Sequence, residues 1–177
     1  AETSVTEAQT KVAEAKAKLS AATDKAAKAK AESALKTAEA NLQSANGDLK
    51  IAQAKANVKN AESRAARNEA KAELNRVKAE VNADLRLTRA ENKLAKAKTE
   101  TEIKAAKSEL TAIQTETQNA LKIADADLKV AKAKTKVSEA TNKVAKAEAK
   151  AELKTLKTEA KNIKIDVKLE KDNDTTI

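Results

Sequence analysis

Large aliphatic residues recur every seven positions along much of this chain, and an alanine follows most of them three residues later. The longest run consists of Ile123, Ala126, Val130, Ala133, Val137, Ala140, Val144 and Ala147. A seven-residue repeat keeps both residue types on one stripe of an α-helix, with the aliphatic residue at position a and the alanine at position d. Alanine is small enough to let two helix axes come closer than the usual ~8–10 Å. The pattern therefore predicts an all-α fold of alanine-rich coiled-coil helices.

The missing residue types limit the core further. The 177 residues include no Phe, Trp, Tyr, Pro, Cys, Met or His and a single glycine, whereas 42 are Ala and 30 are Val, Ile or Leu. Aromatic side chains normally supply much of the buried area of a globular core. Without them the chain can build a thin seam between closely spaced helices, but not a thick core.

The low content of large aliphatic residues also fits a disordered chain. Two features favour order. The net charge of +9 arises from 36 basic and 27 acidic residues, so the charges are mixed, and the apolar residues keep a strict periodicity. We therefore expect ordered helices.

The apolar stripe changes side at several places. It slips by two residues from Leu49 to Ile51, and again from Leu121 to Ile123. Two residues correspond to a rotation of about 200° around a helix. Either the chain turns at these places, or one helix is buried first on one side and then on the other. Both explanations require more neighbours than a two-stranded coil provides.

Three short segments with turn-forming residues stand 36 residues apart: Asn46-Gly47-Asp48, Asn82-Ala83-Asp84 and Gln118-Asn119-Ala120. Glycine can end one helix, and aspartate can cap the next. We therefore expect a degenerate repeat of long antiparallel segments in a bundle. The repetitive helical region 1–162 would divide into segments at about 1–45, 49–81, 85–117 and 121–162. One continuous helical rod is the alternative.

The large aliphatic residues of the stripe form the candidate functional surface. We expect the following residues to lie at helix contacts: Val12, Leu19, Leu35, Leu42, Val58, Leu94, Val130, Val137 and Val144. Such a seam can join helices of one chain or of several chains. The expected partner is therefore another copy of the chain, in a homo-oligomer or filament.

Residues 163–177 show a different periodicity. Apolar residues alternate with charged ones at Ile163, Ile165, Val167 and Leu169. This period of two predicts a short β-strand or extended tail, which would need the sheet edge of another molecule and so act as an assembly tail. Leu156 and Ala160 continue the apolar positions with helical spacing, so a continued helix is the alternative.

Few side chains of this sequence could carry chemistry. Without His or Cys, a serine lacks its usual base and zinc lacks its usual ligands. One glycine excludes a glycine-rich phosphate loop. No apolar run approaches the ~18 residues of a membrane span. We therefore expect a protein that is not an enzyme, that binds no cofactor, metal or small-molecule substrate, and that has no membrane span.

The leading functional hypothesis is a structural protein that self-associates as a filament subunit, surface coat or scaffold. The chain begins at Ala1 without a methionine, as it would after signal-peptide cleavage or at a start chosen for expression. On the first reading the protein is secreted or lies at the cell surface.

Two other functions stay open. The Ala, Lys, Glu and Thr content resembles that of late-embryogenesis-abundant proteins, which implies a stress protectant. The second open function is that of a basic protein that binds nucleic acid weakly, because five arginines lie between residues 64 and 89. Interleaved acids and the absence of aromatic side chains for base stacking count against nucleic acid as a partner.

Overall fold

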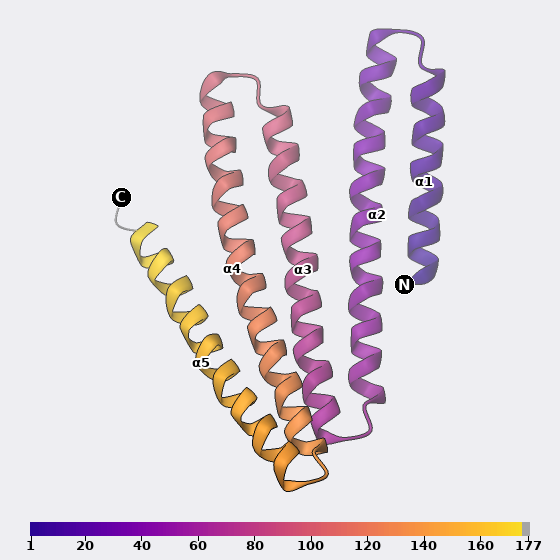
Figure 1. Ribbon diagram of the computed structural model, residues 1–177. Helices are drawn as coiled ribbons and strands as arrows, with labels where there is room; N and C mark the ends of the chain where they lie inside the picture. Colours follow the sequence, from indigo (N-terminus) through magenta and orange to yellow (C-terminus); the bar gives the residue numbers. More distant parts are fainter. Residues whose placement is uncertain (175–177) are drawn as a thin grey trace. The chain divides into compact units, whose positions relative to one another are not determined.

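The computed structural model describes residues 1–174, and helices account for nearly all of them (Figure 1). Five helices follow one another: α1 Glu2–Ala21, α2 Lys25–Asn60, α3 Arg64–Lys96, α4 Glu100–Glu139 and α5 Lys143–Asp174. Alanine, lysine and glutamate are strong helix formers, and the chain contains no proline. No β-strand occurs among residues 1–174. The predicted all-α fold is confirmed.

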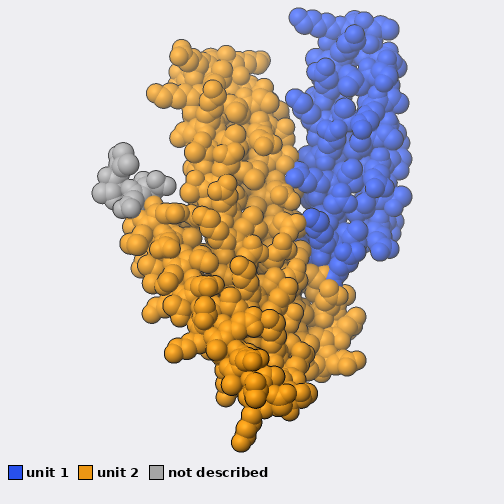
Figure 2. All heavy atoms as spheres, in the orientation of Figure 1, with its two compact units in different colours: residues 1–53 blue, residues 54–177 orange. Residues whose placement is uncertain are grey.

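The chain divides into two compact units, Ala1–Gln53 and Ala54–Ile177 (Figure 2). The first unit holds α1 and most of α2, which form a helical hairpin. Its core cluster consists of Val12, Ala15 and Ala38, with Leu35 and Leu42 packed against it. The buried side chains are small, so this unit is held by a thin seam.

The second unit holds the end of α2 together with α3, α4 and α5. The central helix is α4, which packs against α3 on one side and against α5 on another (Figure 1). Neighbouring helices in this unit run in opposite directions, because only three residues separate each helix from the next.

The turns between helices share one pattern: an alanine, a variable residue and a helix-capping residue. They are Ala22-Thr23-Asp24, Ala61-Glu62-Ser63, Ala97-Lys98-Thr99 and Ala140-Thr141-Asn142. The alanine is extended, with φ −66° and ψ 132° at Ala97. The third residue then caps the next helix, as Asn142 Oδ1 accepts the Ala145 backbone N–H at 2.8 Å. No described residue has a positive φ, so these turns need no glycine.

The predicted turns at 46–48, 82–84 and 118–120 are wrong, because these segments lie inside α2, α3 and α4. The segment boundaries derived from them are wrong for the same reason. The middle residues Gly47, Ala83 and Asn119 are buried, so a small or compact side chain serves helix packing there. The 36-residue spacing also separates the capping residues Ser63 and Thr99. The other intervals between capping residues are 39 residues, from Asp24 to Ser63, and 43 residues, from Thr99 to Asn142, so the helical units vary in length and the 36-residue repeat is not regular.

The predicted strand or tail over residues 163–177 is wrong for residues 163–174, which continue α5. Residues 175–177 lie outside the described residues. Ile163 lines the groove between α4 and α5, and Val167 is buried one turn later, as the helical alternative requires. Ile165 and Leu169 are exposed on another side of α5. A helix satisfies its own backbone hydrogen bonds, whereas a lone strand would have no partner among the described residues.

Candidate functional site

Each of the first four helices ends with the same seam, which we call the outgoing stripe. Counted back from the alanine that follows the helix, large aliphatic residues stand at three and ten residues, and small residues at seven and fourteen. Its members are Ala8, Val12, Ala15 and Leu19 in α1; Gly47, Ile51, Ala54 and Val58 in α2; Ala83, Leu87, Ala90 and Leu94 in α3; and Ala126, Val130, Ala133 and Val137 in α4. All eight small residues are buried. Small side chains thus occupy buried positions in every outgoing stripe.

A second seam begins each of the last four helices, and we call it the incoming stripe. Counted forward from the capping residue, alanine stands at seven, leucine at eleven and an apolar residue at fourteen. The members are Ala31, Leu35 and Ala38; Ala70, Leu74 and Val77; Ala106, Leu110 and Ile113; and Ala149, Leu153 and Leu156. Every member is at least half-buried.

In two helix pairs, residues of an outgoing stripe lie beside residues of the incoming stripe of the next helix. In the first unit, Val12 and Ala15 of α1 meet Ala38 of α2. In the second unit, Ala126 of α4 and Leu156 of α5 line one groove. The same spacing of buried residues therefore recurs in the α1–α2 and α4–α5 pairs.

The second half of α4 is buried on two faces. Leu128 and Thr135 line a groove with residues of α3, and the Thr135 hydroxyl donates to the Ala65 carbonyl oxygen at 3.4 Å. Two residues before these positions, Ala126 and Ala133 are also buried, and Ala126 lines a groove with residues of α5. The two-residue slip from Leu121 to Ile123 therefore reflects one helix with two neighbours. The second of the two sequence explanations is correct at this place.

Ion pairs flank both seams of α4. Between α3 and α4 the pairs are Arg76–Asp125 at 2.8 Å, Arg86–Glu116 at 2.6 Å and Lys93–Glu109. Between α4 and α5 the pairs are Lys136–Glu152 at 2.8 Å and Lys164–Asp127 at 2.7 Å. Such partly exposed pairs contribute about 0–1 kcal/mol each. Their main effect is to favour one register of antiparallel helices.

Arg76 is the most highly connected charged residue among these pairs. Besides Asp125, its guanidinium lies 3.5 Å from Glu73 and 3.4 Å from Glu80. The pKa of Arg76 is raised, first by the hydrogen bond to Asp125, against desolvation and with the help of the nearby carboxylates. The arginines between residues 64 and 89 therefore do not all remain available for phosphate, because Arg76 and Arg86 already pair with acids.

Eight of the nine predicted seam residues are buried or half-buried. Val12 is buried, and Leu19, Leu35, Leu42, Val58, Leu94, Val130 and Val137 are half-buried. Val144 is the exception, with 69% of its surface exposed. It stands at the start of α5 after the turn, so Val144 belongs to none of the seams buried within the chain.

The sequence reasoning missed the capping residues of the turns. At the start of α4, the Thr99 hydroxyl accepts the Glu102 backbone N–H at 3.2 Å, and Glu102 Oε2 accepts the backbone N–H groups of Lys98 and Thr99. These backbone donors lower the pKa of Glu102, the Lys98 N–H most strongly. The signal was present, because a threonine followed three residues later by glutamate is a capping box.

It also missed three polar residues within the seams of α4. Thr117, Asn119 and Thr135 are buried, and each has a hydrogen-bond partner. Thr117 and Thr135 bond to backbone carbonyl groups, whereas Asn119 reaches across to Glu170 of α5. A heptad pattern assigns such positions to apolar residues and gives no signal for them.

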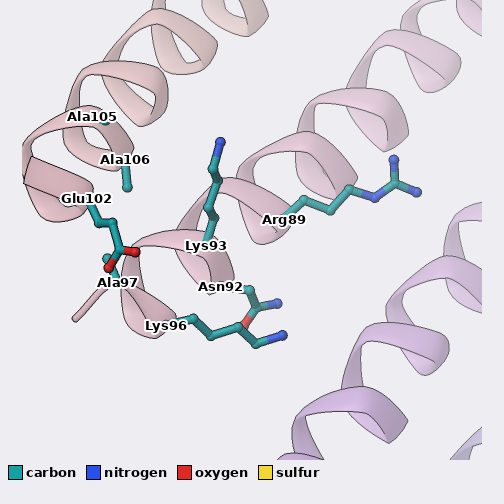
Figure 3. A pocket seen from close by; sticks show the side chains of 8 residues that line it. All are labelled: Arg89, Asn92, Lys93, Lys96, Ala97, Glu102, Ala105 and Ala106. Carbon is teal, nitrogen blue, oxygen red and sulfur yellow. The ribbon is translucent and has the colours of Figure 1, made fainter. Parts of the chain in front are cut away.

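A surface hollow of about 660 Å³ lies where α3 ends and α4 begins. Arg89, Lys93 and Lys96 line it, but their side chains extend in different directions (Figure 3). Lys93 is already paired with Glu109. The hollow therefore lacks the convergent polar groups of a ligand site.

The described residues contain no cluster of three or more His, Cys, Asp or Glu side chains that could hold a metal ion. None of the helices described is long and apolar enough to cross a membrane. Comparison with known proteins finds no matching family model, no similar curated protein and no similar solved structure.

Proposed function

We propose that this chain is a non-enzymatic structural protein that self-associates through alanine-rich helical seams, as a filament subunit, surface coat or scaffold. The observation that carries the proposal is the burial of all eight small residues of the outgoing stripes. Because the same spacing of small and large apolar residues recurs at the ends of the first four helices, a helix of another copy can meet a compatible surface. A secreted or cell-surface location belongs to the same proposal.

The charged residues support a structural role over a chemical one. The interhelical pairs described above neutralise cations and acids along the seams rather than gathering them at one point. Catalysis requires groups with perturbed pKa values that converge on a substrate. The two pKa shifts described here belong to an ion-pair centre and a helix cap.

Sedimentation of the chain at several concentrations and physiological salt tests the proposal, with negative-stain microscopy of the same samples. We expect the sedimentation coefficient to rise with concentration and regular particles or filaments to appear. A helical monomer at every concentration would reject self-association. A coil spectrum by circular dichroism in dilute buffer would instead favour the stress protectant, and a salt-sensitive gel shift would favour nucleic-acid binding.

A further inference from the structure

Among residues 1–172, the exposed large aliphatic residues are Val144, Ile165 and Leu169, at 69%, 45% and 56%. All three belong to α5. At about 100° per residue they fall within about 60° of the helix circumference. Ala147, Ala151 and Thr158 lie between them on the same stripe and are exposed as well. We call these six residues the outer stripe of α5.

The outer stripe runs opposite to the face that packs on α4. Ala149, Ala160 and Val167 are buried, and they lie on the far side of the α5 circumference from Ile165. From Val144 to Leu169 the stripe is about 38 Å long. It repeats the design of the internal seams, with large aliphatic residues separated by small ones that permit close approach.

Charged residues of α5 are sorted onto two flanks of the outer stripe. All nine lysines from Lys143 to Lys171 fall on one flank of the helical circumference. The acidic residues up to Glu170 fall on the other flank, among them Glu148, Glu159 and Asp166. Any helix that covers the outer stripe must therefore offer acids to one flank and lysines to the other.

A second α5 meets this requirement in one orientation. When two such helices face each other in parallel, about a two-fold axis along their length, the lysine flank of one faces the acidic flank of the other on both sides. When they are antiparallel, lysines face lysines and acids face acids. Like charges across a helix pair are destabilising, whereas opposite charges set partner and orientation.

We infer that the outer stripe of α5 binds the outer stripe of α5 in a second copy of the chain, with the two helices parallel. The inference rests on the proposed self-association and adds the surface and the orientation. The contact between two copies uses no residue of the internal seams, because Val144, Ile165 and Leu169 are exposed while α5 is packed on α4.

Disulfide cross-linking tests the orientation, because the natural chain has no cysteine. In a parallel pair each residue of the stripe faces its own counterpart. The single variants Val144→Cys and Ile165→Cys should therefore both form covalent dimers on mild oxidation, well above Ala112→Cys, an exposed control on α4. The two positions are about 32 Å apart along α5, so an antiparallel pair links at most one of them. Linkage of only one variant, or of neither above the control, overturns the inference.

Charge reversal gives an independent test, because it should change the strength of association in opposite directions for the parallel and the antiparallel pair. In the parallel pair, Lys154→Glu with Lys161→Glu brings acids against the acidic flank, and we expect association to weaken several-fold by sedimentation equilibrium. In an antiparallel pair the same change would strengthen association, which overturns the inference. Lys11→Glu with Lys18→Glu, at the same spacing on the exposed surface of α1, controls for net charge.

The outcomes separate this inference from the proposed function. If the natural chain is monomeric at all concentrations, both are rejected. If it associates but the α5 cross-links fail, self-association stands and this surface is not its site. If a monomer binds vesicles of phosphatidylserine and phosphatidylcholine without dimerising, the outer stripe covers lipid, and the second copy is rejected.

Discussion

Asn119 of α4 donates a hydrogen bond from Nδ2 to Glu170 Oε2 of α5 at 2.8 Å, across 51 residues of sequence. Asn119 is buried within a seam made otherwise of apolar and small residues. A buried amide without a partner would cost about 1–3 kcal/mol, so this bond favours the register in which the two residues meet.

Replacing the amide by a carboxylate tests this contact. Asn119→Asp sets a second acid beside Glu170, and we expect the free energy of unfolding to fall by about 1–2 kcal/mol. Glu170→Gln restores a donor across the seam, so Asn119→Asp should cost less in that background. Urea denaturation followed by circular dichroism measures both values. Equal losses in the two backgrounds would show that the residues do not interact.

Removing the cap of α4 tests the turn pattern. Thr99→Ala deletes the hydroxyl that accepts the Glu102 N–H, and we expect a loss of about 0.5–2 kcal/mol of stability. Thr101→Ala removes an exposed hydroxyl in the same turn and serves as the control. If both variants lose the same stability, the turn does not depend on its cap.

Acid should weaken the same turn through Glu102. Its pKa in the folded chain lies below the ordinary 4.5, because backbone N–H groups bind the carboxylate. The stabilisation is therefore present above pH 4.5 and is lost as the pH falls through the folded pKa. The difference in free energy of unfolding between the natural chain and Glu102→Gln should be larger at pH 7 than at pH 3. A difference that is equal at both pH values would contradict this, and Glu100→Gln gives the comparison for a neighbouring acid.

Gly47 offers a test that separates a helix middle from a helix end. It is buried inside α2, with no positive φ, at the position that holds alanine in the other outgoing stripes. Gly47→Ala should therefore raise stability by about 0.5–1 kcal/mol through helix propensity. Gly47→Leu should lower it by overfilling the seam. A loss of stability in Gly47→Ala would favour the turn that the sequence first indicated.

The burial of the predicted seam residues could be read from the sequence because burial here follows periodicity. Val130 and Val137 stand seven residues apart and both are half-buried, as the heptad requires. The slip from Leu121 to Ile123 indicates a change of buried face, and α4 has neighbours on both faces. Helical periodicity carries such information because side chains at fixed spacing share a face.

The turns could not be placed by searching for glycine. Ala97-Lys98-Thr99 has the composition of a helix interior, and its backbone needs only extended φ and ψ values that any residue adopts. Gly47 attracts attention as a turn residue, but its lack of a side chain serves packing. The alternation from Ile163 to Leu169 is equally ambiguous, since Ile163 and Val167 also share a helical face toward α4.

Ala133 provides the most direct test of the central claim, that small side chains set the helix contacts. It is 1% exposed, whereas Ala112 in the same helix is exposed. We predict that Ala133→Leu lowers the free energy of unfolding by about 1–3 kcal/mol, and that Ala112→Leu changes it by less than about 0.5 kcal/mol. Equal stability of the two variants in urea denaturation would contradict the account, because Ala133 would then not lie at a close contact between helices.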